Sequence, residues 1–162
     1  MPGRDEPFIT KNYYHVFNKS IEGKQIFRFI SSTNYFLNLL RYYRSSKAKI
    51  SFSKLKKLSK ILLEDLLSSV NNKKFFQIDI ISYCLMPNHF HLLLRQKRDG
   101  GVRKFMSDVL NAFTRYFNIL HERKGPIFLS RFKSVRIATD EQLVHVSRYI
   151  HLNPVSSYLI EP

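Results

Sequence analysis

Residues 75–96, FFQIDIISYCLMPNHFHLLLRQ, are the most informative part of the chain about its fold. Both halves of this stretch are rich in β-branched, aromatic and leucine side chains, which favour strands. Pro87 and Asn88 lie between the halves and are typical turn residues. The stretch therefore predicts a hairpin, with one strand ending at Met86 and the next beginning at His89.

Further elements follow on both sides of this hairpin, from the period of the apolar residues and from capping residues. The expected elements are a strand over 13–18, a helix capped by Thr33, a helix over 102–120, a strand over 132–137, and a last helix that Thr139 opens and Pro154 helps to stop. Strands mixed with helices over a single sheet indicate an α+β fold.

The segment from about 44 to 74 is strongly basic, and its later half has leucines at helical spacing. We interpret it as a basic helical insert within one domain spanning residues 1–162, because a chain of this length can bury an adequate core by itself. Its lysines either face solvent or follow DNA, and the sequence leaves both interpretations open.

Charge gives the first indication of function. Lys and Arg number 27 against 12 Asp and Glu, which makes the net charge +15. Such an imbalance is commonly neutralised by a nucleic acid. The sequence has no run of 18 apolar residues, and its lone Cys84 has no partner for an internal disulfide. We therefore expect a cytoplasmic, nucleoid-associated protein that binds nucleic acid and no membrane.

His89, Phe90 and His91 are the central candidates for chemistry. Alternate side chains of a strand share one face, so both imidazoles point the same way, roughly 6.5–7 Å apart along the chain, while Phe90 points into the core. Two convergent imidazoles suit a divalent metal ion. The alternative for a His-x-His pair is two polar side chains without a metal.

The last helix supplies a nucleophile and a third polar group. His145, Tyr149 and Asn153 recur every four residues and line one side of that helix. A phenol is a poor nucleophile at neutral pH, and a metal ion helps it by polarising the phosphate under attack. Tyr149 is the candidate nucleophile, and His145 is an open candidate for the general base. Tyr116 is the rival nucleophile, although its place beside an apolar stripe favours packing.

At these residues the chain resembles the single-tyrosine HUH transposases, in particular the REP-associated tyrosine transposases. The matching blocks are YHVFNKS (14–20), YCLMPNHFHLLL (83–94), TRYFN (114–118), SRFKSV (130–135) and RYIHLNPV (148–155). The resemblance implies a ferredoxin-like antiparallel sheet flanked by helices, the HUH endonuclease fold. It also implies that His89, His91 and Asn153 hold Mg²⁺ or Mn²⁺ and that Tyr149 is catalytic.

The substrate that the resemblance implies is single-stranded DNA folded into hairpins, which is cut and rejoined through a 5′-phosphotyrosine. We expect DNA contacts from four polar side chains, which are Arg131, Lys133, Asn18 and Lys19. A homodimer and a monomer both stay open. The runner-up function is a non-catalytic protein that binds single-stranded nucleic acid. A metal hydrolase has little support, because the HExxH motif and clustered zinc spacings are missing.

Overall fold

The computed structural model describes residues 6–156 and contains a four-stranded sheet. Its strands are β1 (Tyr13–Lys19), β2 (Ile78–Met86), β3 (His89–Gln96) and β4 (Lys133–Ile137). They lie in the order β2-β3-β1-β4, and each neighbouring pair is antiparallel. The longer helices are α1 (Ile30–Tyr43), α2 (Lys60–Asn71), α3 (Gly101–Leu120) and α4 (Asp140–Ser156). The succession β1-α1-β2-β3-α3-β4 in this strand order is ferredoxin-like, which confirms the predicted fold class.

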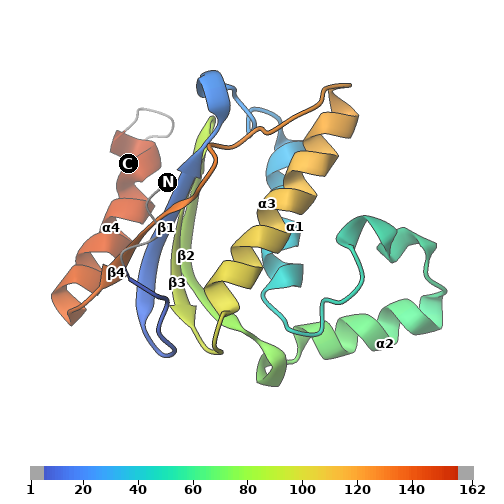
Figure 1. The fold of residues 1–162 in the computed structure, drawn as a ribbon, viewed down its shortest axis with the longest axis horizontal. Helices are drawn as coiled ribbons and strands as arrows, with labels where there is room; N and C mark the ends of the chain where they lie inside the picture. Colours follow the sequence, from blue (N-terminus) through green and yellow to red (C-terminus); the bar gives the residue numbers. More distant parts are fainter. Residues whose placement is uncertain (1–5, 157–162) are drawn as a thin grey trace.

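The sheet has helices on both faces, with α1 and α3 on one side and α4 on the other (Figure 1). The period of two along β3 explains the two layers, because successive side chains point to opposite faces. Phe90 and Leu92 are fully buried in the larger core, where they join Phe36 of α1 and Phe113 of α3. His89 and His91 therefore point to the face that α4 covers.

A smaller apolar cluster attaches α4 to the sheet. Ile150 of α4 is fully buried there, in a cluster that includes Leu93 of β3 and Cys84 of β2. Thr139 caps the helix as predicted, since its hydroxyl accepts a hydrogen bond from the backbone N–H of Gln142 at 3.2 Å. This attachment places the polar side of α4 over the histidine-bearing part of the sheet.

Two predicted helix ends were wrong. The helix α1 begins at Ile30, three residues before the expected cap, and the hydroxyl of Thr33 instead donates to the carbonyl of Phe27 at 3.2 Å. The helix α4 continues through Pro154 to Ser156. A proline removes a single N–H bond, and in the last turn of a helix the chain can tolerate that loss.

The basic segment before β2 forms the helix η2 (Phe52–Lys57), then α2, then η3 (Lys73–Phe75). It lies on the side of the molecule away from α4 (Figure 1). The hydroxyl of Ser59 caps α2 by accepting from the N–H of Leu62. None of the helices within residues 6–156 is both long and apolar enough to cross a membrane.

Candidate active site

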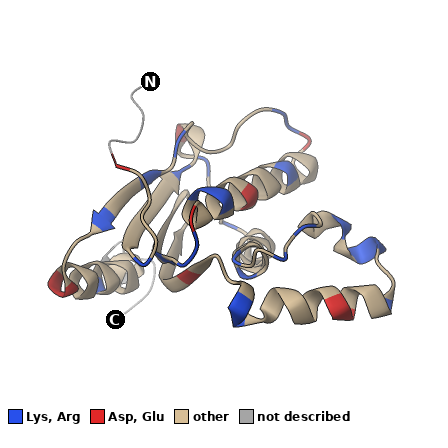
Figure 2. Cartoon of the chain, turned by 60° about the horizontal axis from the view of Figure 1, so that its bottom comes forward, with Lys and Arg blue, Asp and Glu red and all other residues tan. Residues whose placement is uncertain are grey.

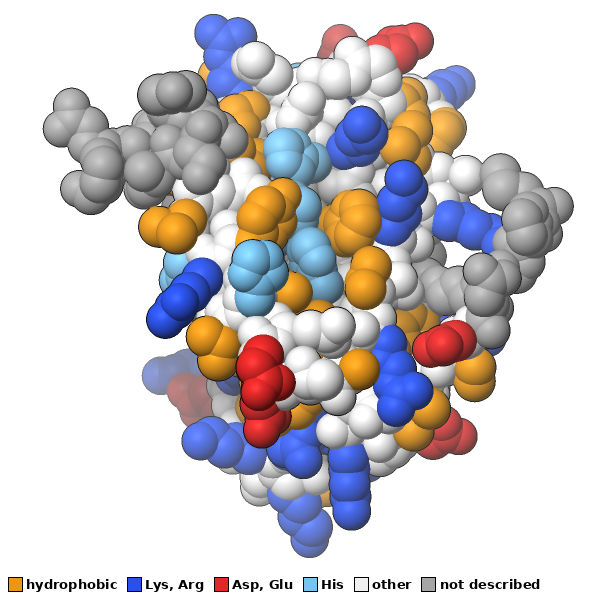
Figure 3. All heavy atoms as spheres, turned by 90° about the vertical axis from the view of Figure 1, so that its left-hand side faces the viewer, with side chains coloured by type: hydrophobic (Ala, Val, Ile, Leu, Met, Phe, Trp, Pro, Cys, Tyr) orange, Lys and Arg blue, Asp and Glu red, His pale blue; other side chains and the backbone are white. Residues whose placement is uncertain are grey.

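The two predicted metal-binding histidines lie at the start of β3, beside the Pro87–Asn88 turn. Their ring centroids are 5.2 Å apart, and the planes of the rings are nearly perpendicular at 85°. His91 is buried, and His89 is half-buried. Figure 3 shows histidine side chains gathered near the centre of this face, with Lys and Arg around them.

Helix α4 brings Tyr149 against this pair. The centroid of its ring lies 5.5 Å from that of His91, in an edge-to-face arrangement at 89°. The side chain remains 47% exposed, so a DNA strand can reach it from solvent. Asn153 lies one turn further along α4 and is buried. The structure thus brings the predicted nucleophile to the predicted histidines, although their chemical roles stay predictions.

The rival nucleophile, Tyr116, lies elsewhere. It belongs to α3, across the sheet from α4, and its ring stacks on that of Tyr35 with centroids 3.8 Å apart and planes at 8°. A ring held in this way is a packing residue, as its sequence context indicated. The geometry therefore favours Tyr149.

A third histidine, His15 of β1, was missed by the sequence analysis. Its Nε2 lies 3.0 Å from Nδ1 of His91, and the two rings stack with centroids 5.2 Å apart. Its ring also meets that of Tyr149 edge-on, at 6.0 Å. The available signal was the strand period, which places His15 and Phe17 on one face of β1. The alternation of side chains along a strand does not show which strands pair, so the pairing of β1 with β3 could not be predicted from it.

The three imidazoles are poor bases in this setting. Burial, together with the neighbouring His15 and His89, lowers the pKa of His91 to about 4. Burial also lowers the pKa of His89, with a contribution from the charge of Lys19, and burial alone lowers that of His15. An imidazole must be neutral to bind a metal ion, so these rings are in the required form at neutral pH.

The residues present fit a hard divalent ion. Nδ1 of His89 lies 2.7 Å from the side-chain oxygen of Asn88, which can only accept a hydrogen bond. Nδ1 therefore carries the proton, and the lone pair of Nε2 is free for an ion. Among residues 6–156, no three His, Cys, Asp or Glu side chains are grouped to hold an ion by themselves. Oxygen ligands from Asn153, DNA and water would have to complete the shell, as Mg²⁺ and Mn²⁺ prefer.

The four predicted DNA contacts divide between two places. Lys19 and Lys133 are exposed on the α4 side of the sheet, since Lys19 pairs with His89 and Lys133 pairs with Phe17. Both cations therefore lie on the same face of the sheet as the histidine pair.

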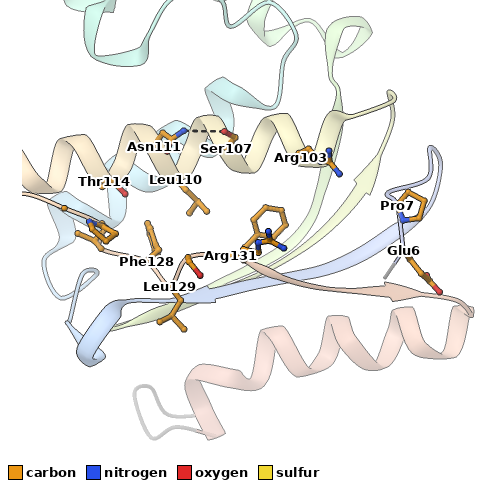
Figure 4. A pocket seen from close by; sticks show the side chains of 15 residues that line it. Glu6, Pro7, Arg103, Ser107, Leu110, Asn111, Thr114, Phe128, Leu129 and Arg131 are labelled. Atoms are coloured by element: carbon orange, nitrogen blue, oxygen red, sulfur yellow. Dashed lines mark hydrogen bonds between the residues drawn. The ribbon is translucent and has the colours of Figure 1, made fainter. Parts of the chain in front are cut away.

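Asn18 and Arg131 lie towards α3, on the other side of the sheet from that pair. Asn18 is buried on the opposite side of β1, where its amide donates to the carbonyl of Leu129 at 3.2 Å and its oxygen accepts from the N–H of Lys19. The buried and bonded side chain therefore has a structural role, and its DNA contact stays a prediction. Arg131 lines a separate hollow of about 880 Å³ beside α3, together with Arg103 and Asn111 (Figure 4).

Comparison with known proteins identifies the family. The family described as "Transposase IS200 like" matches residues 48–153, which is more than half of the chain and includes His89, His91, Tyr149 and Asn153. The chain belongs to this transposase family. No curated protein matches it.

The fold is also found among solved structures. A REP-associated tyrosine transposase, solved bound to a REP hairpin, superposes with a TM-score of 0.56 at 17% sequence identity, over 99% of this chain and 77% of that one. A Deinococcus radiodurans protein, provisionally described as a transposase, has a TM-score of 0.48 at 13% identity, over 93% of this chain and 95% of that one. The first of these structures supports the shared fold.

Proposed function

We propose that this member of the IS200-like transposase family cuts and rejoins single-stranded DNA, with Tyr149 as the nucleophile and Mg²⁺ or Mn²⁺ at His89 and His91. The observation that carries the proposal is the 5.5 Å separation between the rings of Tyr149 and His91. A tyrosine that is 47% exposed, beside two neutral imidazoles, suits attack on a phosphate better than it suits packing.

In the proposed step, the phenolic oxygen of Tyr149 forms a bond to the phosphorus of a phosphodiester. The bond from that phosphorus to the 3′-oxygen breaks, and the 3′-oxygen takes up a proton to leave as a hydroxyl. The proton of the phenol passes to solvent, to which the side chain is open. The product is a 5′-phosphotyrosine, which keeps the energy of the phosphodiester so that a 3′-hydroxyl can reverse the step.

A bound divalent ion would polarise the phosphate and stabilise its developing charge. The residues that would hold the ion are His89 and His91, through Nε2, and Asn153, through its amide oxygen. Asn153 follows Tyr149 by one helical turn, so both side chains leave α4 on the same side. A single helix, α4, would thereby fix the position of the nucleophile relative to that of an ion ligand.

For the substrate, we propose a DNA strand next to a short hairpin. The REP-associated transposase with the same fold was solved with such a hairpin, and the net charge of +15 suits a polyanion. Lys19 and Lys133 lie on the face of the histidine pair, so they are the proposed phosphate contacts next to the cleavage point.

The test is covalent capture. Hairpin DNA labelled on the 3′ side of the expected cleavage point is incubated with the protein and Mn²⁺, and the mixture is run on a denaturing protein gel. Wild type should retain label, because the 5′-phosphate of the labelled strand stays attached to the enzyme. Tyr149→Phe should lose the label, because it removes only the nucleophilic oxygen. Tyr116→Phe is the matched control and should retain it.

Two results would count against the proposal. Label retained by Tyr149→Phe would move the nucleophile elsewhere. Tight binding without any adduct, over several hairpins, would favour a non-catalytic binding protein. The double variant His89→Ala/His91→Ala should lose the adduct but keep most of the DNA affinity, because contacts to phosphates elsewhere supply much of that affinity.

A further inference from the structure

His15 makes the contact that this inference concerns. It lies on β1 and approaches His91 across the strand pair, with Nε2 of His15 3.0 Å from Nδ1 of His91. One of these two nitrogens must carry a proton and the other must accept it, so the contact fixes the tautomers of both rings together.

The neighbouring His89 shows a hydrogen-bonding arrangement that His91 can share. His89 has its Nδ1 on the oxygen of Asn88, at 2.7 Å, and that oxygen is an acceptor. His91 also has its Nδ1 in a hydrogen bond, with Nε2 of His15 as the partner, and here either nitrogen can be the donor. If His91 donates from Nδ1, both histidines of the pair direct an unprotonated Nε2 away from their partners. Metal-binding histidines are commonly held in this way by an acceptor on the other ring nitrogen.

We propose that His15 is a positioning residue that accepts a hydrogen bond from Nδ1 of His91 and thereby keeps Nε2 of His91 free for the divalent ion. The inference rests on the proposed function, because it assigns a purpose to one histidine of the proposed ion site. His15 acts through His91 and is not itself an ion ligand. The absence of any ion-holding group of three His, Cys, Asp or Glu among residues 6–156 agrees with that assignment.

The packing around His15 supports a fixed orientation. Its ring lies 5.0 Å from that of Phe17, is stacked on His91 at 27°, and meets Tyr149 edge-on at 6.0 Å. A ring held on three sides by other rings cannot easily turn its Nε2 away from His91. The same contacts allow a sharp test, because a phenylalanine fills a similar volume and lacks the acceptor.

The experiment compares wild type with His15→Phe and His15→Gln. The amide oxygen of Gln extends about as far as Nε2 of His and can accept the same bond. The first measurement is the tautomer of each ring, by NMR of metal-free protein labelled with ¹⁵N-histidine at pH 8. We expect His91 protonated at Nδ1 in wild type and in His15→Gln, and a shift towards the Nε2-protonated form in His15→Phe. The tautomer of His89 should not change in any variant, since its partner is Asn88.

The second measurement is Mn²⁺ affinity, from the electron paramagnetic resonance signal of the free ion. His15→Phe should weaken binding about 10–100-fold, as is usual when the partner of a metal-binding histidine is removed. His15→Gln should recover most of that loss. His121→Ala, which removes an exposed histidine at the end of α3, is the control and should bind Mn²⁺ as wild type does.

An unchanged tautomer of His91 in His15→Phe would overturn the inference, as would failure of Gln to restore Mn²⁺ binding. The tautomer measurement needs neither metal nor DNA. The covalent capture assay with Tyr149→Phe tests the proposed function separately, so the two failures can be told apart.

Discussion

At the scale of single residues, His91 is where three elements meet. The strand β3 carries it, β1 supplies His15 and Phe17 at its ring, and α4 supplies Tyr149. Burial among these rings keeps its imidazole neutral and lowers its pKa to about 4. The protonation of these three imidazoles is therefore the main way in which pH acts on this group of rings.

This burial predicts a pH-dependent stability for the metal-free protein. An unfolded histidine has a pKa near 6.5, so between pH 6.5 and 4 the unfolded chain binds a proton that folded His91 does not. The free energy of unfolding should therefore be highest above pH 6.5. It should fall as the pH decreases below that value, by up to about 1.4 kcal/mol per pH unit for one proton. His15 and His89 add to the fall, because their pKa values are lowered too.

Urea unfolding at several pH values between 4.5 and 7.5 measures this slope. In His91→Gln, the free energy of unfolding should change less steeply with pH, by an amount that corresponds to about one proton, because glutamine does not titrate. Equal slopes in wild type and His91→Gln would contradict the burial argument.

The residues of the site that the sequence could predict are those related by local periodicity. The period of two on a strand relates His89 to His91, and the helical turn relates Tyr149 to Asn153. His15 could not be found in this way, since it meets His91 across 76 positions of the chain. That contact depends on β1 lying beside β3 in one particular register, which neither strand specifies alone. The burial of Asn18 could not be predicted for the same reason, because it also depends on how distant segments pack.

At the scale of elements, α4 matters most to the proposed function because it carries Tyr149 and Asn153. It is attached to the sheet through a small apolar cluster, in which Ile150 is its fully buried side chain. The sequence predicted the existence of every helix and strand of the sheet layers, but it misplaced the start of α1 and the end of α4. Helix ends depend on single backbone bonds, which apolar periodicity does not report.

Shortening Ile150 should loosen this attachment. We expect Ile150→Ala to lower the free energy of unfolding by about 2–4 kcal/mol, as for other buried isoleucines. Ile119→Ala is a matched control, since Ile119 is 74% exposed on α3 and its loss should cost less than about 0.5 kcal/mol. Urea unfolding followed by circular dichroism measures both, and equal effects would contradict the assignment of Ile150 as the anchor of α4.

At the scale of the whole molecule, positive charge is spread over several elements (Figure 2). The basic segment before β2 lies away from α4, whereas Lys19 and Lys133 lie on the face of the histidine pair. The phosphates of a single strand bound at Tyr149 should therefore be neutralised by Lys19 and Lys133, and not by the basic segment. Net charge alone predicted a nucleic-acid partner, but the division of cations between two sides appears only in the folded chain.

The salt dependence of the DNA affinity shows whether Lys19 and Lys133 or the lysines of the basic segment contact the strand. Each phosphate contact on a single strand contributes about 0.7 to the slope of log affinity against log salt. Lys19→Gln/Lys133→Gln should reduce the magnitude of this slope by about 1.4 for a short unstructured strand, measured by fluorescence anisotropy. Lys56→Gln/Lys57→Gln removes two exposed lysines of η2 and should leave the slope unchanged. The reverse pattern would place the strand on the basic segment instead.

The most direct test is to locate the covalent bond itself. Protein is reacted with hairpin DNA and Mn²⁺, digested with protease and nuclease, and the modified peptide is sequenced by mass spectrometry. We predict a nucleotide attached through phosphate to the tyrosine of the peptide that contains Arg148, Tyr149 and Ile150. A modification at Tyr116, or on any residue other than Tyr149, would contradict the account.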